Sequence, residues 1–393
     1  MRIGQFKGEL VALIFQMIFI LYSLSGVVYE NGLITNLLMV FSVLLSTYYC
    51  VLSNLRYSNK FLRILTIFIT LYVIYFFLSS NQIVFSIVGT PITKLYTLKV
   101  VLFAISSFFP FYYIANKYDY SIYNKKIVLF YLILFFMSIV KYITRRNELD
   151  FEGVEGGLNV AYTFVACLPI AAIFMKKKFI YYTIIGILMV LIIAAMKRGA
   201  IVVGLMMILV CIYHALKMKS KVNSNRITNV IVVIFFAAIL SLVAYNSVVT
   251  NEALLNRFAE ISEGGSGRDM IYTTLLNKWI EPDDATSFLF GYGMNATVKF
   301  TGFFAHNDWL EVAITCGLLG VIIYIMMIYR LYKCGKTNED YIGKTIVMMI
   351  VVAWLVSSLF SMFYSSTLTF IYMMLIGIIL GNNDRKIRKN FNN

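Results

Sequence analysis

Long apolar stretches separated by short polar connections make up most of this 393-residue chain. Most of them are about 17–23 residues long, and a helix needs about 20 residues to cross the roughly 30 Å hydrocarbon core of a bilayer. The pattern predicts an all-α, polytopic integral membrane protein with about 12 transmembrane helices. The predicted spans cover about residues 10–29, 33–53, 61–79, 96–116, 127–143, 158–175, 179–196, 199–216, 227–249, 309–331, 345–362 and 365–380.

One long polar interval interrupts this pattern between the ninth and tenth spans. It divides the chain into transmembrane helices 1–9 (residues 1–249), a large, partly helical external loop (250–308), and helices 10–12 with a basic tail (309–393). Apolar residues at helical spacing in 251–261 predict an amphipathic helix lying on the membrane. Ser266, with Asp269 three residues later, resembles a capping box that opens a second helix, which runs through Trp279 and stops at Pro282.

The composition supports the membrane class. The chain is 60% hydrophobic and only 13% charged, whereas soluble domains are about one quarter charged. With this topology, 23 of the 34 basic residues lie in cytoplasmic connections and in the cytoplasmic N- and C-termini. That bias is the positive-inside rule, so the net charge of +15 reflects orientation in the membrane and does not indicate a nucleic-acid partner.

The sequence has few residues that could bind a metal ion or form a disulfide framework. The five cysteines are scattered singly, mostly in apolar runs, and no CxxC pair occurs. His214 and His306 are the only histidines. We therefore expect no metal site, no disulfide framework and no cofactor.

Basic residues at the external face are the first candidates for chemistry. Lys197 and Arg198 stand at the tight junction of the seventh and eighth spans, where they oppose the orientation bias. A bidentate arginine there would suit an anionic lipid headgroup, and a snorkelling pair at a turn is the alternative. Arg268 falls in the first turn of the second loop helix, where free N–H groups also favour phosphate. Solvated surface charge or pairing with a neighbouring acid is the alternative for Arg257 and Arg268.

His306 is the sharper signal, because it precedes the tenth span directly. Asp308 is expected to cap that span, with Glu311 at the reciprocal position. A helix N-terminus disfavours imidazolium, and a neutral ring suits a proton acceptor. The alternative is an interfacial histidine hydrogen-bonded to the loop, which is also how we interpret His214.

In their order and placement these residues resemble the O-antigen ligase and polymerase superfamily (Wzy-like). The resemblance covers about residues 196–320 by motif and the remainder by hydropathy. One departure is Lys197, where many relatives have serine. The residues that carry it are Arg198-Gly199, Arg257, Ser266-Gly267-Arg268, Trp279, Gly291 and Gly293, His306-Asn307, Trp309-Leu310, and Gly317-Leu318-Leu319-Gly320.

The resemblance implies a GT-C-like membrane glycosyltransferase on the outer face of the bacterial cytoplasmic membrane. Its substrates would be undecaprenyl-diphosphate-linked oligosaccharides, used without metal or nucleotide sugar. Membrane lipids and a chain-length regulator are the other partners that it implies. His306 would be the catalytic base, and Arg198, Arg257 and Arg268 would bind the diphosphate. The residues that would support this site are Lys197, Asn307, Asp308 and Glu311.

Three functions stay open at this point. The leading hypothesis is a polymerase of repeat units for a surface polysaccharide, either O-antigen of lipopolysaccharide or capsule. A ligase that moves finished glycan to a lipid or protein acceptor needs the same loop. A polysaccharide or lipid transporter is the alternative from another class, and it predicts charges along a path through the bilayer centre, whereas nearly all charge here lies at span ends.

Overall fold

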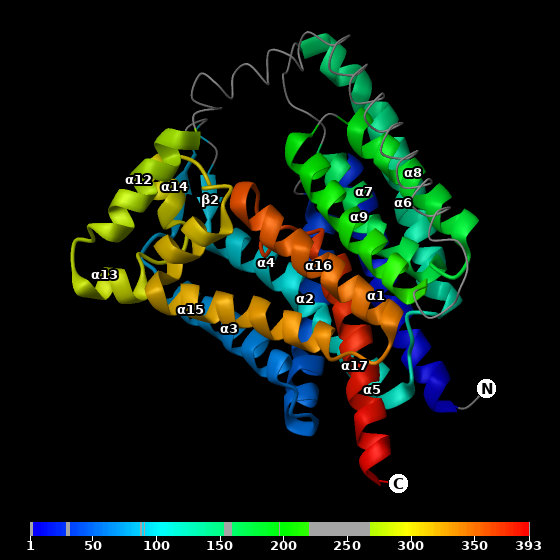
Figure 1. Ribbon diagram of the computed structural model, residues 1–393. Coiled ribbons are helices and arrows are strands. Elements are labelled where there is room, and N and C mark those ends of the chain that lie inside the picture. The colour runs from blue at the N-terminus through cyan, green and yellow to red at the C-terminus, as the bar shows by residue number, and fades with distance from the viewer. Residues whose placement is uncertain are drawn as a thin grey trace. The chain divides into compact units, whose positions relative to one another are not determined.

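The fold is almost entirely helical (Figure 1). The structure is a computed structural model and describes residues 3–28, 32–86, 89, 91–152, 159–195, 197–219 and 268–392. The elements are α1 (Ile3–Val28), α2 (Leu33–Arg56), α3 (Lys60–Leu78), β1 (Ile83–Phe85), β2 (Pro91–Thr93), α4 (Lys94–Ser106), α5 (Phe108–Tyr118), α6 (Lys125–Glu152), α7 (Val160–Cys167), the 3₁₀ helix η1 (Leu168–Phe174), α8 (Lys178–Ala194), α9 (Arg198–Lys219), α12 (Arg268–Ile280), α13 (Ala285–Phe290), α14 (Ala296–Thr301), α15 (Asp308–Lys336), α16 (Tyr341–Phe360) and α17 (Thr369–Asn392).

The chain is a polytopic membrane protein. Within the described ranges, eight helical segments are long and apolar enough to cross a bilayer: α1, α2, α3, α4 with α5, α6, α9, α15 and α16. Each coincides with a predicted span. The sixth and seventh predicted spans form the shorter apolar helices α7–η1 and α8, the twelfth lies in α17, and the ninth falls outside the described residues.

The helices divide between two compact units. The first contains α1–α5, the β1–β2 hairpin, α12–α15, residues 354–360 of α16, and α17. The second contains α6–α9 with η1 and residues 341–353 of α16. Every residue of the loop 268–308 that the structure describes belongs to the first unit.

Within the first unit, α3 lies antiparallel along α15. Near the C-terminal end of α3 the Tyr75 hydroxyl donates to the Cys316 carbonyl of α15, and further back Phe68 packs on Tyr324 at 6.0 Å. The Asn59 side chain caps α3 by accepting from the N–H groups of Phe61 and Leu62. Because α3 has 19 residues, its two ends stand about 28 Å apart at 1.5 Å per residue.

Glycine allows α17 to pack closely on α5. Gly377 and Gly381 stand four residues apart on one face of α17, so the two helix backbones approach each other there. A Cβ atom at Gly377 would lie 2.6 Å from the Phe108 carbonyl, and one at Gly381 would lie 2.5 Å from the Tyr112 carbonyl. This contact fixes the C-terminal part of α17 beside the end of α5.

Two local features differ from the predictions. The fourth span is two helices, because α4 ends at Ser106 and α5 begins at Phe108. The connection after the third span contains a short antiparallel hairpin in which Ile83 pairs with Thr93. Thr93 then caps α4 by accepting from the Tyr96 N–H group.

Candidate functional site

The segment 268–308 forms three short helices that pack on the N-terminal half of α15 (Figure 1). Ile271 and Leu275 of α12 share a small buried core with Ile314 of α15. The predicted second loop helix is confirmed, since α12 begins at Arg268 and ends at Ile280, two residues before Pro282. The predicted amphipathic helix at 251–261 and its capping residue Ser266 lie outside the described residues.

A glycine turn joins this layer to α15. Gly291 and Gly293 both have positive φ, which glycine adopts without steric cost. The N–H groups of Tyr292 and Gly293 donate to the carbonyls of Ile314 and Thr315 at 2.8 and 3.1 Å. α15 frees these carbonyls by breaking its helical geometry at Gly317, where φ is 64° and ψ is −161°. The loop is therefore attached through backbone hydrogen bonds to a kink in the helix.

His306 occupies an unusual backbone conformation at the entrance to α15. Its φ is 50°, one of three positive values among the described non-glycine residues, and its side chain is exposed. Positive φ is uncommon for residues with a Cβ atom, and such conformations are enriched at functional sites. The Tyr272 hydroxyl of α12 donates to the His306 carbonyl at 3.4 Å.

The prediction that Asp308 caps this helix is wrong by one residue. Asn307 is the N-cap, and its side-chain oxygen accepts from the N–H groups of Trp309 and Leu310 at 3.0 and 3.2 Å. Its amide nitrogen donates to the Leu359 carbonyl at the end of α16 at 3.0 Å. Asn307, the residue after His306, therefore contacts the start of α15 and the end of α16 at the same time.

Asp308 and Glu311 are buried under the His306 turn. Asp308 accepts from the Tyr324 hydroxyl at 2.6 Å and from the Phe363 N–H group at 3.1 Å. Glu311 does not take the reciprocal capping position, and it accepts instead from Thr297 at 2.8 Å and from the Ala305 N–H group at 2.6 Å. Burial of a carboxylate without hydrogen bonds is costly, and these hydrogen bonds offset that cost. The Asp308 and Glu311 side chains thus support the His306 turn through buried hydrogen bonds.

We expect Asp308→Ala to lower the free energy of unfolding by about 3 kcal/mol, because the Tyr324 hydroxyl and the Phe363 N–H group would remain buried without an acceptor. Thermal unfolding in detergent measures the loss. The matched control is Asp283→Ala, since the Asp283 side chain is 64% exposed and pairs with Lys278 at the surface. Equal midpoints for the two variants would contradict the supporting role of Asp308.

Arg268 approaches the same place from α12. Its guanidinium donates to the Phe360 carbonyl at 2.9 Å, while Asn307 donates to the neighbouring Leu359 carbonyl. These carbonyls belong to the last turn of α16, where carbonyl groups have no N–H partner within the helix. Burial raises the pKa of the Tyr272 phenol, and the nearby Arg268 charge acts in the opposite direction. Arg268, Tyr272 and the His306 turn therefore converge at the end of α16.

The other two predicted arginines are not part of this geometry. Arg198 is the first residue of α9 in the second unit, and it is half-buried, as is Lys197 before it. The tight junction that the sequence predicts is confirmed, because α8 ends at Ala194 and α9 begins at Arg198. Arg257 lies outside the described residues.

Tyr272 is the residue of this site that the sequence analysis missed. It stands four residues after Arg268 on α12, and residues at this spacing are neighbours on one helix face. That spacing is a usable signal once Arg268 is suspected. In the ranges that the structure covers, no group of three histidine, cysteine or acidic side chains is placed to hold a metal ion together.

Comparison with known proteins adds no assignment. No protein-family model matches the chain, and no curated protein sequence matches it. The class of the protein therefore follows from its apolar helices, and its function has to be argued from the site.

Proposed function

We propose that the protein is a membrane glycosyltransferase that polymerises undecaprenyl-diphosphate-linked oligosaccharide repeat units into a surface polysaccharide. The observation that carries this proposal is the convergence of Arg268, Tyr272 and the His306 turn at the end of α16. A fixed cation beside an exposed imidazole provides the two functions that this reaction needs, which are charge stabilisation and proton removal.

The reaction is a displacement at the anomeric carbon of the donor sugar. His306 takes the proton of the acceptor hydroxyl while the hydroxyl oxygen forms the new glycosidic bond. The bond between the anomeric carbon and the phosphate oxygen breaks, and its electron pair leaves with undecaprenyl diphosphate. Arg268 stabilises the negative charge that grows on the leaving oxygen. On the basis of the sequence motif, we also assign Arg198 and Arg257 to diphosphate binding.

The remaining residues position the base. Asn307 caps α15, and Glu311 accepts from the N–H group of Ala305, so the chain is fixed on both sides of His306. Asp308 attaches the start of α15 to the loop after α16. Precise placement matters because displacements of about 1 Å in such sites can reduce rates by about 100-fold.

The proposal includes the topology. We place twelve spans in a bacterial cytoplasmic membrane, with both termini in the cytoplasm and the His306 turn on the outer face. Single cysteines introduced into 268–305 test this arrangement, since we expect them to react with a membrane-impermeant maleimide in intact cells with a permeable outer layer.

Purified protein in liposomes tests the activity. With a single undecaprenyl-diphosphate-linked oligosaccharide as both donor and acceptor, we expect a ladder of longer lipid-linked products and release of undecaprenyl diphosphate. A ligase would leave that substrate unextended and transfer the glycan only when a separate lipid or protein acceptor is added. No consumption of the lipid-linked sugar under either condition would contradict the proposal.

Arg268→Lys is expected to lose most of the activity, about 10-fold or more, although it retains the charge. Lysine lacks the planar fork that can hold the Phe360 carbonyl and a phosphate oxygen at the same time. The rate of polymer formation measures the effect. Lys278→Arg is the matched control, because Lys278 lies on the same helix and pairs with Asp283. Equal rates for Arg268→Lys and wild type would reduce Arg268 to a general source of positive potential.

A further inference from the structure

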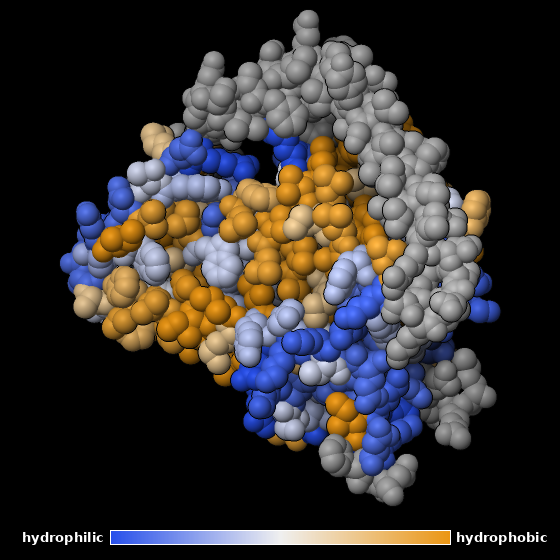
Figure 2. All heavy atoms as spheres, in the orientation of Figure 1, coloured by the Kyte–Doolittle hydropathy of each residue, from blue (hydrophilic) through white to orange (hydrophobic). Residues whose placement is uncertain are grey.

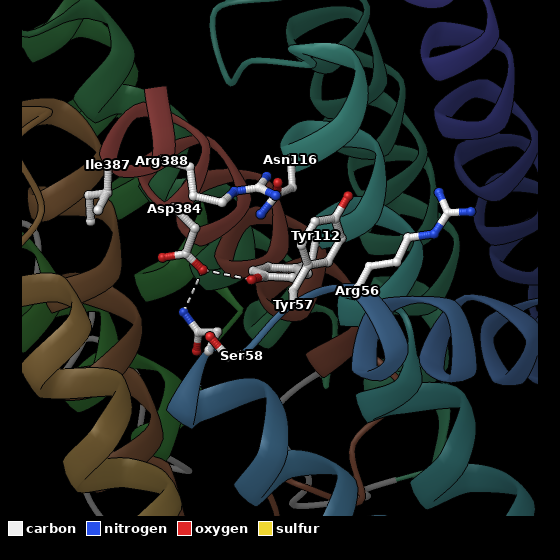
Figure 3. Close-up of a pocket in the computed structure, with 9 residues that line it drawn as sticks. Arg56, Tyr57, Ser58, Tyr112, Asn116, Asp384, Ile387 and Arg388 are labelled. Carbon is white, nitrogen blue, oxygen red and sulfur yellow. Dashed lines mark hydrogen bonds between the residues drawn. The ribbon is translucent and has the colours of Figure 1, made fainter. Parts of the chain in front are cut away.

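A polar cavity lies at the N-terminal end of α3. Its volume is about 240 Å³, and about 10–15 Å³ of such space already holds a water molecule. It is formed where α2 ends, α3 begins, α5 ends and α17 passes by (Figure 3). The residues that line it are Arg56, Tyr57, Ser58, Asn59, Tyr112, Asn116, Asp384, Ile387 and Arg388.

The cavity has a built polar wall. Asp384 accepts from the Tyr112 hydroxyl at 2.6 Å and from the Asn59 amide at 2.7 Å, both through the same carboxylate oxygen (Figure 3). The close packing of Gly381 on α5 brings Asp384 to this position. The second carboxylate oxygen takes no part in these two hydrogen bonds, and Asp384 lines the cavity.

Asn116 provides the observation that points to a ligand. Its side chain is only 3% exposed, and neither its amide oxygen nor its amide nitrogen has a hydrogen-bond partner in the described part of the chain. Buried amides without partners are rare and costly. A ligand that both donates and accepts hydrogen bonds would satisfy both atoms.

Arg388 supplies the positive charge. Its guanidinium lies over the Tyr57 ring at 4.8 Å from the ring centroid. Arg56 lines the same cavity, although its guanidinium donates to the Tyr113 hydroxyl at 2.8 Å. Figure 2 shows hydrophilic side chains gathered around the C-terminal part of α17, in contrast to the apolar surface along α15. The cavity thus opens where apolar helix gives way to charged chain, at the level of lipid headgroups.

We propose that this cavity binds the phosphodiester headgroup of a membrane phospholipid that carries a hydroxyl or ammonium donor. Arg388 holds the phosphate oxygens, the free oxygen of Asp384 accepts from the headgroup donor, and Asn116 bridges the two parts. The inference does not depend on the proposed glycosyl transfer, because binding is measured without oligosaccharide.

Native mass spectrometry of the full-length, delipidated protein tests this site. We expect one retained molecule of phosphatidylglycerol or phosphatidylethanolamine, and weaker retention of phosphatidylcholine, whose headgroup has no donor. Arg388→Gln and Asn116→Ala are each expected to lower the affinity for the retained lipid about tenfold. Lys389→Gln is the matched control, since Lys389 is the exposed neighbour of Arg388 outside the cavity lining and should bind lipid as the wild type does.

Three results would overturn the assignment. Equal retention of phosphatidylcholine, or retention unaffected by Arg388→Gln, would show that the headgroup is not recognised here. Displacement of the lipid by excess inorganic phosphate would show a site for a soluble anion instead. A thermal midpoint measured for each variant excludes unfolding as the cause of lost binding.

Discussion

Replacement of His306 by alanine is expected to abolish polymer formation while the protein remains inserted. Loss of a general base costs about 100- to 10,000-fold in rate, which is enough to remove the polymer ladder from a gel. No other histidine is available to substitute, because His214 is the only other one in the sequence and is buried. Polymer length in the native host and product release in liposomes both measure the effect.

Two further variants separate proton transfer from backbone strain. His306 has a φ of 50°, which glycine adopts without cost. His306→Gly therefore relieves the strain and removes the imidazole, and we expect it to be as inactive as His306→Ala. His214→Gln, compared at equal protein level, should retain activity. Full-length polymer from inserted His306→Gly protein would refute the assignment of His306 as base.

Features set by local sequence were predictable. Apolar length indicated the membrane class and located eight spans that the structure contains. The end of α12 followed from Pro282, because proline stops a helix within a few positions. Its start was predicted from a capping pattern at Ser266, which lies outside the described residues.

Features set by distant partners were not predictable. Asn307 and Asp308 are both good caps, and only the contacts of Asp308 with Tyr324 and Phe363 decide between them. The partner of Arg268 lies 92 positions away in the chain. Such pairings depend on how the helices pack, and local propensity does not contain that information.

The kink in α15 shows the same limit most clearly. The run from Asp308 to Lys336 has the hydropathy of one uninterrupted span, and Gly317 within it could be an ordinary helical glycine. Its positive φ is required only because Gly291, 26 residues earlier in the chain, approaches its backbone. The candidate site could therefore be predicted as a set of residues, but the way it is attached to the membrane helices could not.

Gly317→Ala is expected to lower the free energy of unfolding by about 3 kcal/mol or more, through two additive causes. The backbone at φ 64° and ψ −161° lies in a region that only glycine adopts readily. A Cβ atom there would also stand 2.5 Å from the Gly291 nitrogen and 2.6 Å from the Leu289 carbonyl oxygen. Both neighbours are backbone, so neither can move aside by changing a rotamer.

We expect the glycine turn to detach from α15 before the whole protein unfolds, because the kink frees the carbonyls that accept hydrogen bonds from this turn. Cys316, which is fully buried beside Gly317, reports it directly. In a variant that keeps Cys316 as its only thiol, we expect Gly317→Ala to increase the rate of maleimide labelling and to lower the midpoint of thermal unfolding. Gly204→Ala is the matched control, since its Cβ atom would meet only side-chain ends at 3.3 Å or more. Wild-type protection of Cys316 in Gly317→Ala would mean that α15 can hold the loop without the kink.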